Sequence, residues 1–161
     1  AETRSGPWGC PKGRSMSAAE RNRGARCEVH VVNYLRSVGF PDARRYLAGD
    51  GKQPGDIDFA PGIHLEVKDR ADSRWPSWRS QAVAECGERT PIVLRRTRGV
   101  RDVGQWTANI LLASLEAVDL PPLDDHRVFL CKRTDRVWVE LTFEDALMAL
   151  TLEPVVLDGA R

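Results

Sequence analysis

The chain contains 161 residues, of which 42% are hydrophobic and 29% are charged, and its formal net charge is +1. This length predicts one domain with a substantial hydrophobic core and is too short for two. No stretch approaches the roughly 20 apolar residues of a membrane-spanning helix, and the first ten residues, AETRSGPWGC, lack the apolar core of a secretory signal. We therefore expect a cytoplasmic protein with no membrane partner.

The near-neutral net charge combines two regions of opposite sign. Residues 1–101 contain 19 basic and 12 acidic side chains, whereas residues 102–161 contain 5 and 11. The first region is therefore the part of the chain expected to meet a polyanion. Of the 24 basic residues, 20 are arginine, whose planar guanidinium binds phosphate well, but genome base composition can produce the same bias.

The four cysteines are scattered along the chain without a CxxC pair, and the three histidines are isolated in sequence. Structural zinc sites and disulfide frameworks both have characteristic short spacings. The sequence therefore predicts reduced, mostly buried thiols and gives no sign of a zinc site.

A flexible basic arm is predicted at residues 1–16, which are rich in Gly, Pro, Ser and basic side chains. A helix is expected to follow. Ser17 and Glu20 have the spacing of a capping box, and apolar residues then recur at helical spacing until Gly39. Glu20 is accordingly interpreted as a capping residue rather than a ligand. Gly24 interrupts the pattern, so a helix that starts near residue 23 is an alternative.

A hairpin is predicted in GDIDFAPGIHLEVKDR, residues 55–70, after a short strand at 44–48 and a polar turn. Its strands would cover residues 56–60 and 63–68, with a Pro-Gly turn between them. Because side chains alternate across a strand, one set would be buried: Ile57, Phe59, Ile63, Leu65 and Val67. The other set would share the opposite face: Asp56, Asp58, His64, Glu66 and Lys68.

The remaining pattern completes an α/β domain with a central mixed, mainly antiparallel sheet flanked by helices. In chain order, we expect a helix at 76–84, strands at 90–96 and 106–113, a helical turn opened by Ser114, a hairpin at 127–132 and 136–142, and a helix at 142–150. Residues 121–161 would form an acidic extension of the same domain, made of this second hairpin and the last helix.

Three carboxylates crowd the polar face of the first hairpin: those of Asp56, Asp58 and Glu66. A polar strand face is often simply solvated. Neighbouring carboxylates repel one another, however, unless a cation lies among them, and carboxylate oxygens are the ligands that Mg²⁺ prefers. Lys68 falls on the same face, where its ammonium could orient a nucleophilic water. A divalent ion and a lysine directed at one point are suited to phosphodiester cleavage.

The spacing of these residues resembles a known signature. Asp56 stands ten positions before the tripeptide formed by Glu66, Val67 and Lys68. This arrangement resembles the D…(E/D)xK signature of the PD-(D/E)XK nuclease superfamily, in which the aspartate opens one strand of a hairpin and the ExK tripeptide lies on the next. Gly55 occupies the position of the proline that gives the family its name.

The resemblance extends upstream into the first predicted helix. The stretch RGARCEVHVVNYLRSVGF, residues 23–40, is similar to the first helix of archaeal-type Holliday junction resolvases and related phage enzymes, and Glu28 matches their glutamate. The similarity covers residues 20–100 and weakens after Gly99. It implies a restriction-endonuclease-like nuclease core over residues 17–120.

The resemblance also implies a role for each matching residue. Asp56 and Glu66, with the main-chain carbonyl of Val67, would hold Mg²⁺ or Mn²⁺. Lys68 would position or polarise the attacking water. Glu28, brought from the helix, would complete the acidic cluster.

Other residues near the signature have two interpretations each. Asp58 could replace Asp56 as the main ligand, although the separation of Asp56 from Glu66 better resembles that of phage junction endonucleases. Gln81 either forms a hydrogen bond near the site or is an ordinary polar helix residue. His64 either contacts DNA from the polar face or is a solvated strand histidine, and the second interpretation is preferred.

Eight arginines surround the predicted site in sequence and would suit phosphate contacts, although surface solvation also explains such residues. They are Arg21, Arg23, Arg26, Arg44, Arg45, Arg70, Arg74 and Arg79. Two nearby aromatic residues, Trp75 and Trp78, could stack on unpaired bases, but their helical spacing favours a role in the core.

The activity implied by the resemblance is metal-dependent hydrolysis of DNA, with four-way junctions or other branched DNA as substrate. A homodimer is also implied, because cutting two symmetry-related strands requires two active sites related by a two-fold axis. The alternatives are a nuclease of restriction, mismatch or flap specificity and a catalytically silent DNA-binding relative. Presence of the aspartate, glutamate and lysine of the signature disfavours the silent relative.

Overall fold

The computed structural model describes most of the predicted domain, namely residues 17–46, 55–72, 74–115, 127–131 and 136–150. Several predicted features lie outside the described residues: the arm at 1–16, the capping role of the Glu20 side chain, the polar turn before the hairpin, and the end of the acidic extension after residue 150. Within the part that is described, no helix combines the length and the hydrophobicity needed to cross a membrane.

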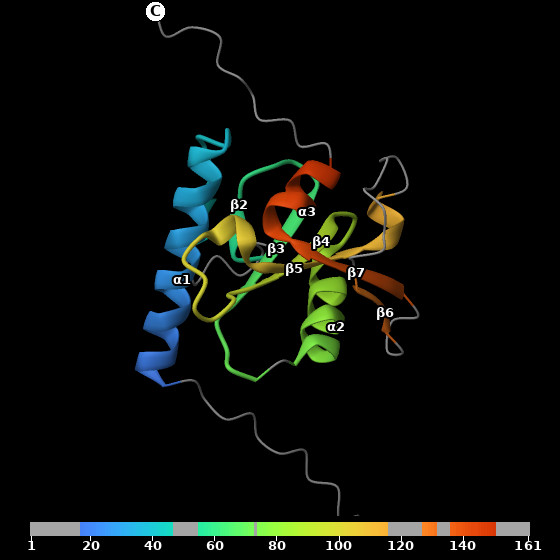
Figure 1. Cartoon of the computed structure of the whole chain (residues 1–161), viewed down its shortest axis with the longest axis horizontal. Coiled ribbons are helices and arrows are strands. Elements are labelled where there is room, and N and C mark those ends of the chain that lie inside the picture. The colour runs from blue at the N-terminus through green and yellow to red at the C-terminus, as the bar shows by residue number, and fades with distance from the viewer. Residues whose placement is uncertain (1–16, 47–54, 73, 116–126, 132–135, 151–161) are drawn as a thin grey trace, which may run out of the picture.

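The described residues form a mixed α/β structure in which three α-helices flank a seven-stranded sheet (Figure 1). The helices are α1 (Ala18–Ser37), α2 (Trp75–Cys86) and α3 (Phe143–Ala149). The strands are β1 (Arg44–Arg45), β2 (Ile57–Asp58), β3 (Ile63–Lys68), β4 (Thr90–Arg95), β5 (Thr107–Leu111), β6 (Arg127–Cys131) and β7 (Arg136–Thr142). Two short 3-10 helices, η1 (Val103–Gln105) and η2 (Leu112–Leu115), lie before and after β5.

The sheet is mixed and mainly antiparallel, as the sequence predicts. Its strand order is β1-β2-β3-β4-β5-β7-β6. Strands β3 and β4 are parallel because α2 returns the chain across one face of the sheet between them. The other five neighbouring pairs are antiparallel.

The first hairpin forms as predicted, although β2 contains only two residues. Ile57 of β2 pairs with Leu65 of β3, and both side chains are buried. Gly55, just before β2, has a φ of 85°, and a Cβ at this position would lie 2.8 Å from the carbonyl oxygen of Leu65. Only glycine fits there, which accounts for its presence where the family signature has proline.

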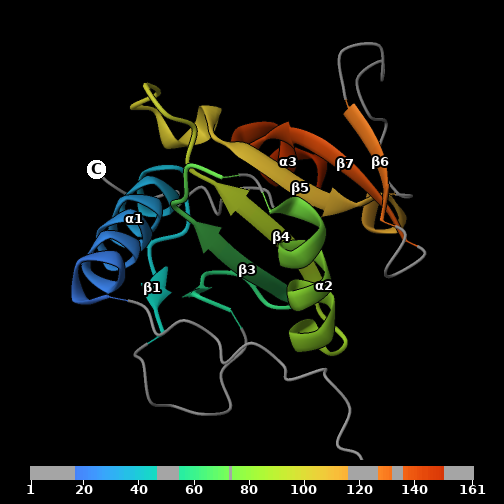
Figure 2. The ribbon, with the colours of Figure 1, turned by 90° about the horizontal axis from the view of Figure 1, so that it is seen from below.

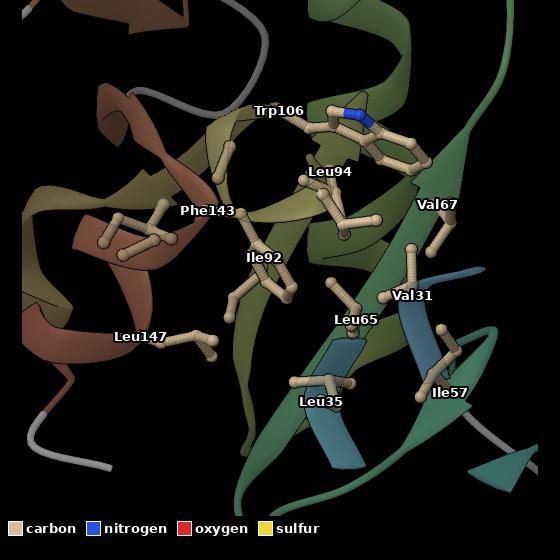
Figure 3. Close-up of a cluster of buried hydrophobic side chains, with 14 of the residues drawn as sticks. Val31, Leu35, Ile57, Leu65, Val67, Ile92, Leu94, Trp106, Phe143 and Leu147 are labelled. Carbon is tan, nitrogen blue, oxygen red and sulfur yellow. The ribbon is translucent and has the colours of Figure 1, made fainter. Parts of the chain in front are cut away.

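One face of the sheet carries an apolar core shared with α1 and α3 (Figure 3). Leu65 and Ile92, paired in register on β3 and β4, are fully buried there. Helix α1 contributes Val31 and Leu35 to the same cluster, and α3 contributes Leu147. Because burial of each such side chain contributes roughly 1.5–3 kcal/mol, this core fixes the hairpin against α1.

Helix α2 covers the opposite face, and α3 lies on the other side of the sheet from it (Figure 2). Helix α2 packs Trp78 and Ala82 against Val93 and Trp138 of the sheet. This face also contains all the buried polar or charged side chains found in the described residues: His64, Glu66, Arg79 and Asn109. The two faces therefore have different chemistry.

Two local predictions are confirmed and one was wrong. Helix α1 starts at Ala18, directly after the predicted cap residue Ser17, so the alternative start near residue 23 does not hold. The helix runs through Gly24 because a helix of 20 residues tolerates a single glycine that costs about 1 kcal/mol. His64 is fully buried rather than solvated, because α2 covers it. Trp78 is a core residue, as predicted, and it contacts Trp75 with the two rings nearly perpendicular.

Candidate active site

Main-chain hydrogen bonds fix Asp56 at the start of β2. The Asp56 N–H donates to the carbonyl oxygen of Leu65 at 2.8 Å, and the Val67 N–H donates to Asp56 Oδ2 at 2.6 Å. The carboxylate is therefore held at the point where β2 meets β3. The register that pairs Ile57 with Leu65 also puts Asp56 beside Glu66 on the neighbouring strand.

The surroundings of Asp56 disfavour its negative charge. Burial and the nearby charge of Glu66 raise the pKa of Asp56 to about 7, although the Val67 N–H and the Lys68 ammonium act in the opposite direction. A positive charge placed beside Asp56 would therefore stabilise its ionised form.

Glu66 and Lys68 form a largely buried ion pair on β3. Lys68 Nζ donates to Glu66 Oε2 at 2.7 Å and to Gln81 Oε1 of α2 at 3.4 Å. Burial alone would raise the pKa of Glu66, but the contacts with His64 and Lys68 outweigh burial and lower this pKa to about 2. The ammonium is thus held between β3 and α2, and Gln81 contacts it directly.

Glu28 reaches the same region from α1 but is paired with an arginine. Arg45 Nε of β1 donates to Glu28 Oε2 at 2.6 Å, and the side chains of the pair are only 31% and 17% exposed. Arg45 offsets the negative charge of Glu28. A further cation would therefore stabilise the Glu28 carboxylate less than it would stabilise that of Asp56.

Asp56, Glu28 and Lys68 line a pocket of about 380 Å³. Three arginines also line it: Arg23, Arg70 and Arg98. Two further acidic residues of the lining are paired with arginines outside it, Asp69 with Arg96 at 3.2 Å and Asp72 with Arg74 at 2.6 Å. The pocket thus combines carboxylates with cationic side chains that suit a phosphate.

Sequence reasoning missed Arg98, which lies in the turn after β4. The N–H of Arg96 donates to the carbonyl oxygen of Lys68 at 2.9 Å, so parallel pairing continues beyond the two strands. This pairing brings the turn beside the end of β3. No local sequence pattern around Arg98 indicates that it lies beside the end of β3.

Asp58 does not line this pocket. Its Oδ2 accepts hydrogen bonds from Arg44 Nε and Nη2 at 3.1 and 2.9 Å, on the exposed side of β1 and β2. Of the two aspartates that the sequence left open, Asp56 is the one at the pocket.

The eight predicted arginines fall into four groups. Two line the pocket, three pair with carboxylates, two are exposed on α1 and one is buried. In that order, they are Arg23 and Arg70; Arg44, Arg45 and Arg74; Arg21 and Arg26; and Arg79.

The prediction that Arg79 contacts DNA was wrong. Arg79 is only 4% exposed, and its Nε donates to Asn109 Oδ1 at 2.8 Å. Its guanidinium also lies 5.7 Å from the ring centre of Trp75 and 5.9 Å from that of Trp138. Arg79 therefore belongs to the packing between α2 and the sheet.

The described residues bring three potential metal-ligand atoms within 4.8 Å of one another only in His64, Glu66 and Glu85. Glu28, Asp56 and Glu66 do not converge this closely as a trio, because Arg45 holds Glu28 and Lys68 holds Glu66. Sequence reasoning missed Glu85. Its position four residues after Gln81 on α2, on the same side of the helix, was the available signal.

Asp56 and Glu66 are nevertheless the residues that could hold a divalent ion, although only Asp56 lines the pocket. They are neighbours across β2 and β3, and with the Val67 carbonyl they offer the oxygen ligands that Mg²⁺ and Mn²⁺ prefer. The raised pKa of Asp56 indicates that a cation beside it would be stabilising.

In comparisons with known proteins, no family model, curated protein or solved structure matches this chain.

Proposed function

We propose that this protein is a DNA endonuclease of the PD-(D/E)XK type that depends on Mg²⁺ or Mn²⁺, with its active site at the pocket lined by Asp56, Lys68 and Glu28. One observation carries the proposal: a buried carboxylate whose ionised form is disfavoured lies with a fixed lysine in a pocket lined by arginines. The chain order supports it, since the aspartate precedes β2, the Glu-x-Lys tripeptide lies on β3, and a helix and a strand follow.

The chain's own residues would bind and orient the scissile phosphate. Arg23, Arg70 and Arg98 would pair with phosphate oxygens and offset the charge that grows in the transition state. Lys68, held by Glu66 and Gln81, would donate a further N–H to the attacking water and keep it in line. A divalent ion held by Asp56, Glu66 and the Val67 carbonyl would supply Lewis acidity.

We further propose branched DNA as the substrate and a homodimer as the active form. Both rest on the resemblance of residues 20–100 to junction resolvases. The basic first region of the chain suits the two closely spaced backbones of a four-way junction. A cytoplasmic, nucleoid-associated enzyme of DNA recombination and repair is the corresponding biological role.

The decisive experiment compares cleavage of a synthetic four-way junction with cleavage of a linear duplex of matched sequence, in Mg²⁺ and in EDTA. We expect Mg²⁺-dependent cutting of the junction. Asp56→Asn and Glu66→Gln should each reduce the rate at least about 100-fold. Asp58→Asn is the matched comparison, because Asp58 is paired with Arg44 outside the pocket, and it should retain most activity.

The outcomes separate the alternatives. Equal cutting of junction and duplex would indicate a nuclease of other specificity. Junction binding with no cutting in any divalent ion would indicate a silent DNA-binding relative. Cutting that persists in EDTA, or that Glu66→Gln leaves unchanged, would overturn the catalytic assignment.

Binding itself provides a second test. Contacts between arginines and phosphates release counterions, so affinity should fall steeply as salt increases. Replacing Arg23, Arg70 and Arg98 with glutamine should weaken binding and flatten this salt dependence. Affinity that does not change between low and moderate salt would contradict the phosphate-binding role of the pocket.

A further inference from the structure

A second group of potential ligands lies between β3 and α2, on the face of the sheet opposite the apolar core. His64, Glu66 and Glu85 each offer one ligand atom, and these atoms all lie within 4.8 Å of one another. The side chains of His64 and Glu66 are 0% and 5% exposed, whereas Glu85 is exposed on α2. The group therefore has two buried members and one that solvent can reach.

Matching backbone spacings bring these residues together. Positions i and i+4 of a helix are about 6 Å apart along its axis, and positions i and i+2 of a strand are roughly 6.6 Å apart. Gln81 accepts a hydrogen bond from Lys68, and its Nε2 donates to Glu85 Oε1 at 3.2 Å. Helix α2 runs back along β3. Since Gln81 contacts Lys68, the residue one helical turn later, Glu85, lies beside the preceding polar residues of the strand, Glu66 and His64.

The imidazole of His64 is a buried polar group without a hydrogen bond. Among the described residues, neither Nδ1 nor Nε2 has a hydrogen-bond partner. His64 Nε2 does lie 3.3 Å from Glu66 Oε1, and this contact contributes to the lowered pKa of Glu66, whereas Nδ1 has no such neighbour. Native proteins rarely leave buried polar atoms unpaired, so each such atom requires an explanation.

The distance of 3.3 Å between His64 Nε2 and Glu66 Oε1 suits two ligands of one ion. In a tetrahedral site with ligand bonds of about 2.0–2.1 Å, two ligand atoms are roughly 3.3–3.4 Å apart. Glu66 Oε2 faces Lys68 at 2.7 Å, so Oε1 is the oxygen directed to His64. Glu66 and Glu85 bring two carboxylates to the site, and Lys68 pairs with the other oxygen of Glu66.

We propose that His64, Glu66 and Glu85 form a binding site for a divalent transition-metal ion, with Zn²⁺ as the best match. Three protein ligands leave the fourth position of a tetrahedron for water or another ligand, and the exposed side of Glu85 gives access to it. Imidazole favours Zn²⁺ over Mg²⁺, which requires oxygen ligands and octahedral geometry. This site does not depend on the proposed nuclease activity, although both would use Glu66.

Metal binding by the full chain, without DNA, tests the proposal. Isothermal titration of the tag-free protein with ZnCl₂ should detect one tight site per chain, and titration with MgCl₂ should not compete for it at equal concentration. Co²⁺ bound at the same site should give the absorption bands of tetrahedral nitrogen and oxygen coordination.

Variants then assign the ligands. Glu85→Gln should weaken Zn²⁺ binding at least tenfold, and it should fold normally because the side chain is exposed. Glu88→Gln is the matched control, being an exposed glutamate three residues later, and it should bind Zn²⁺ as the unmodified chain does. His64→Gln should abolish the cobalt bands, with its circular dichroism spectrum checking the fold. Asp56→Asn should retain the zinc site, which separates it from the proposed nuclease site.

Three results would overturn the zinc site. They are the absence of a tight Zn²⁺ site in the unmodified chain, equal Zn²⁺ affinity in the Glu85→Gln and Glu88→Gln variants, and loss of the site in Asp56→Asn alone. Failure of DNA cleavage in the experiments above would leave this proposal unaffected.

Discussion

The two faces of strand β3 differ in what they bury. On the side of α1 and α3, Leu65 and Val67 pack into a cluster made of apolar residues. On the side of α2, His64 and Glu66 are buried at alternate positions of the same strand. A buried polar or charged group costs free energy unless it is paired. The first face therefore supplies stability, and the second holds groups whose placement requires another explanation.

The comparison indicates how chemistry is built on this sheet. The apolar face fixes the strand register, and the register then fixes where Asp56, Glu66 and Lys68 meet. On the α2 face, two of the buried polar groups have partners: Lys68 pairs with Glu66, and Arg79 donates a hydrogen bond to Asn109. Substitutions on the two faces should therefore have different consequences.

The largest effect on stability is expected on the apolar face. Leu65→Ala removes a side chain that is fully buried between β2, β4 and α1, and it should lower the free energy of unfolding by about 2–5 kcal/mol. Chemical denaturation monitored by circular dichroism measures this. A loss below about 1 kcal/mol would show that this face does not dominate stability.

Arg79 tests whether the buried polar groups of the other face are paired. Arg79→Ala leaves Asn109 without its donor and opens a cavity beside two tryptophans, so it should cost about 2–3 kcal/mol. The double variant Arg79→Met/Asn109→Leu removes both partners of this bond and should recover part of the loss, because Glu140 Oε2 then loses its Asn109 Nδ2 donor. No recovery in denaturant unfolding would contradict pairing as the reason for burial.

Asp56 should make stability depend on pH. Its pKa is about 7 in the folded chain against an ordinary value of 3.8, so the folded state binds the extra proton between these values and stability should fall as pH rises from about 4 to 7. Asp56→Asn removes this loss and should be more stable than the unmodified chain at pH 7, by about 1–3 kcal/mol. Thermal melts across this pH range, without divalent ions, compare the two. Parallel pH profiles would contradict the raised pKa.

The smallest effect is expected at the exposed edge of the hairpin. Arg44 and Asp58 form an ion pair whose side chains are 71% and 34% exposed, and such pairs contribute less than about 1 kcal/mol. Arg44→Gln should therefore change the free energy of unfolding by less than that, and salt should reduce the change further. A larger effect would mean that β1 stabilises the hairpin beyond its ion pair.

Local patterns in the sequence predicted most of the elements. The two-residue alternation in β3 and the Pro-Gly turn before it predict the hairpin. Because alternation is a property of strand geometry, the polar side of β3 carrying Glu66 and Lys68 was also predictable. The apolar periodicity before Gly39 likewise predicted α1.

The tertiary structure decided what those polar side chains meet. The orientation of α2 on the sheet decides that His64 and Arg79 are buried and that Glu85 lies near Glu66. Parallel pairing of β3 with β4 brings Arg98 to the pocket, and β1 brings Arg45 to Glu28. These contacts join residues that are distant in the sequence: Glu28 and Arg45 are 17 positions apart, and Arg79 and Asn109 are 30 positions apart. Helix orientation and strand order decide them, and both depend on how the whole chain buries its apolar surface rather than on any short stretch of sequence.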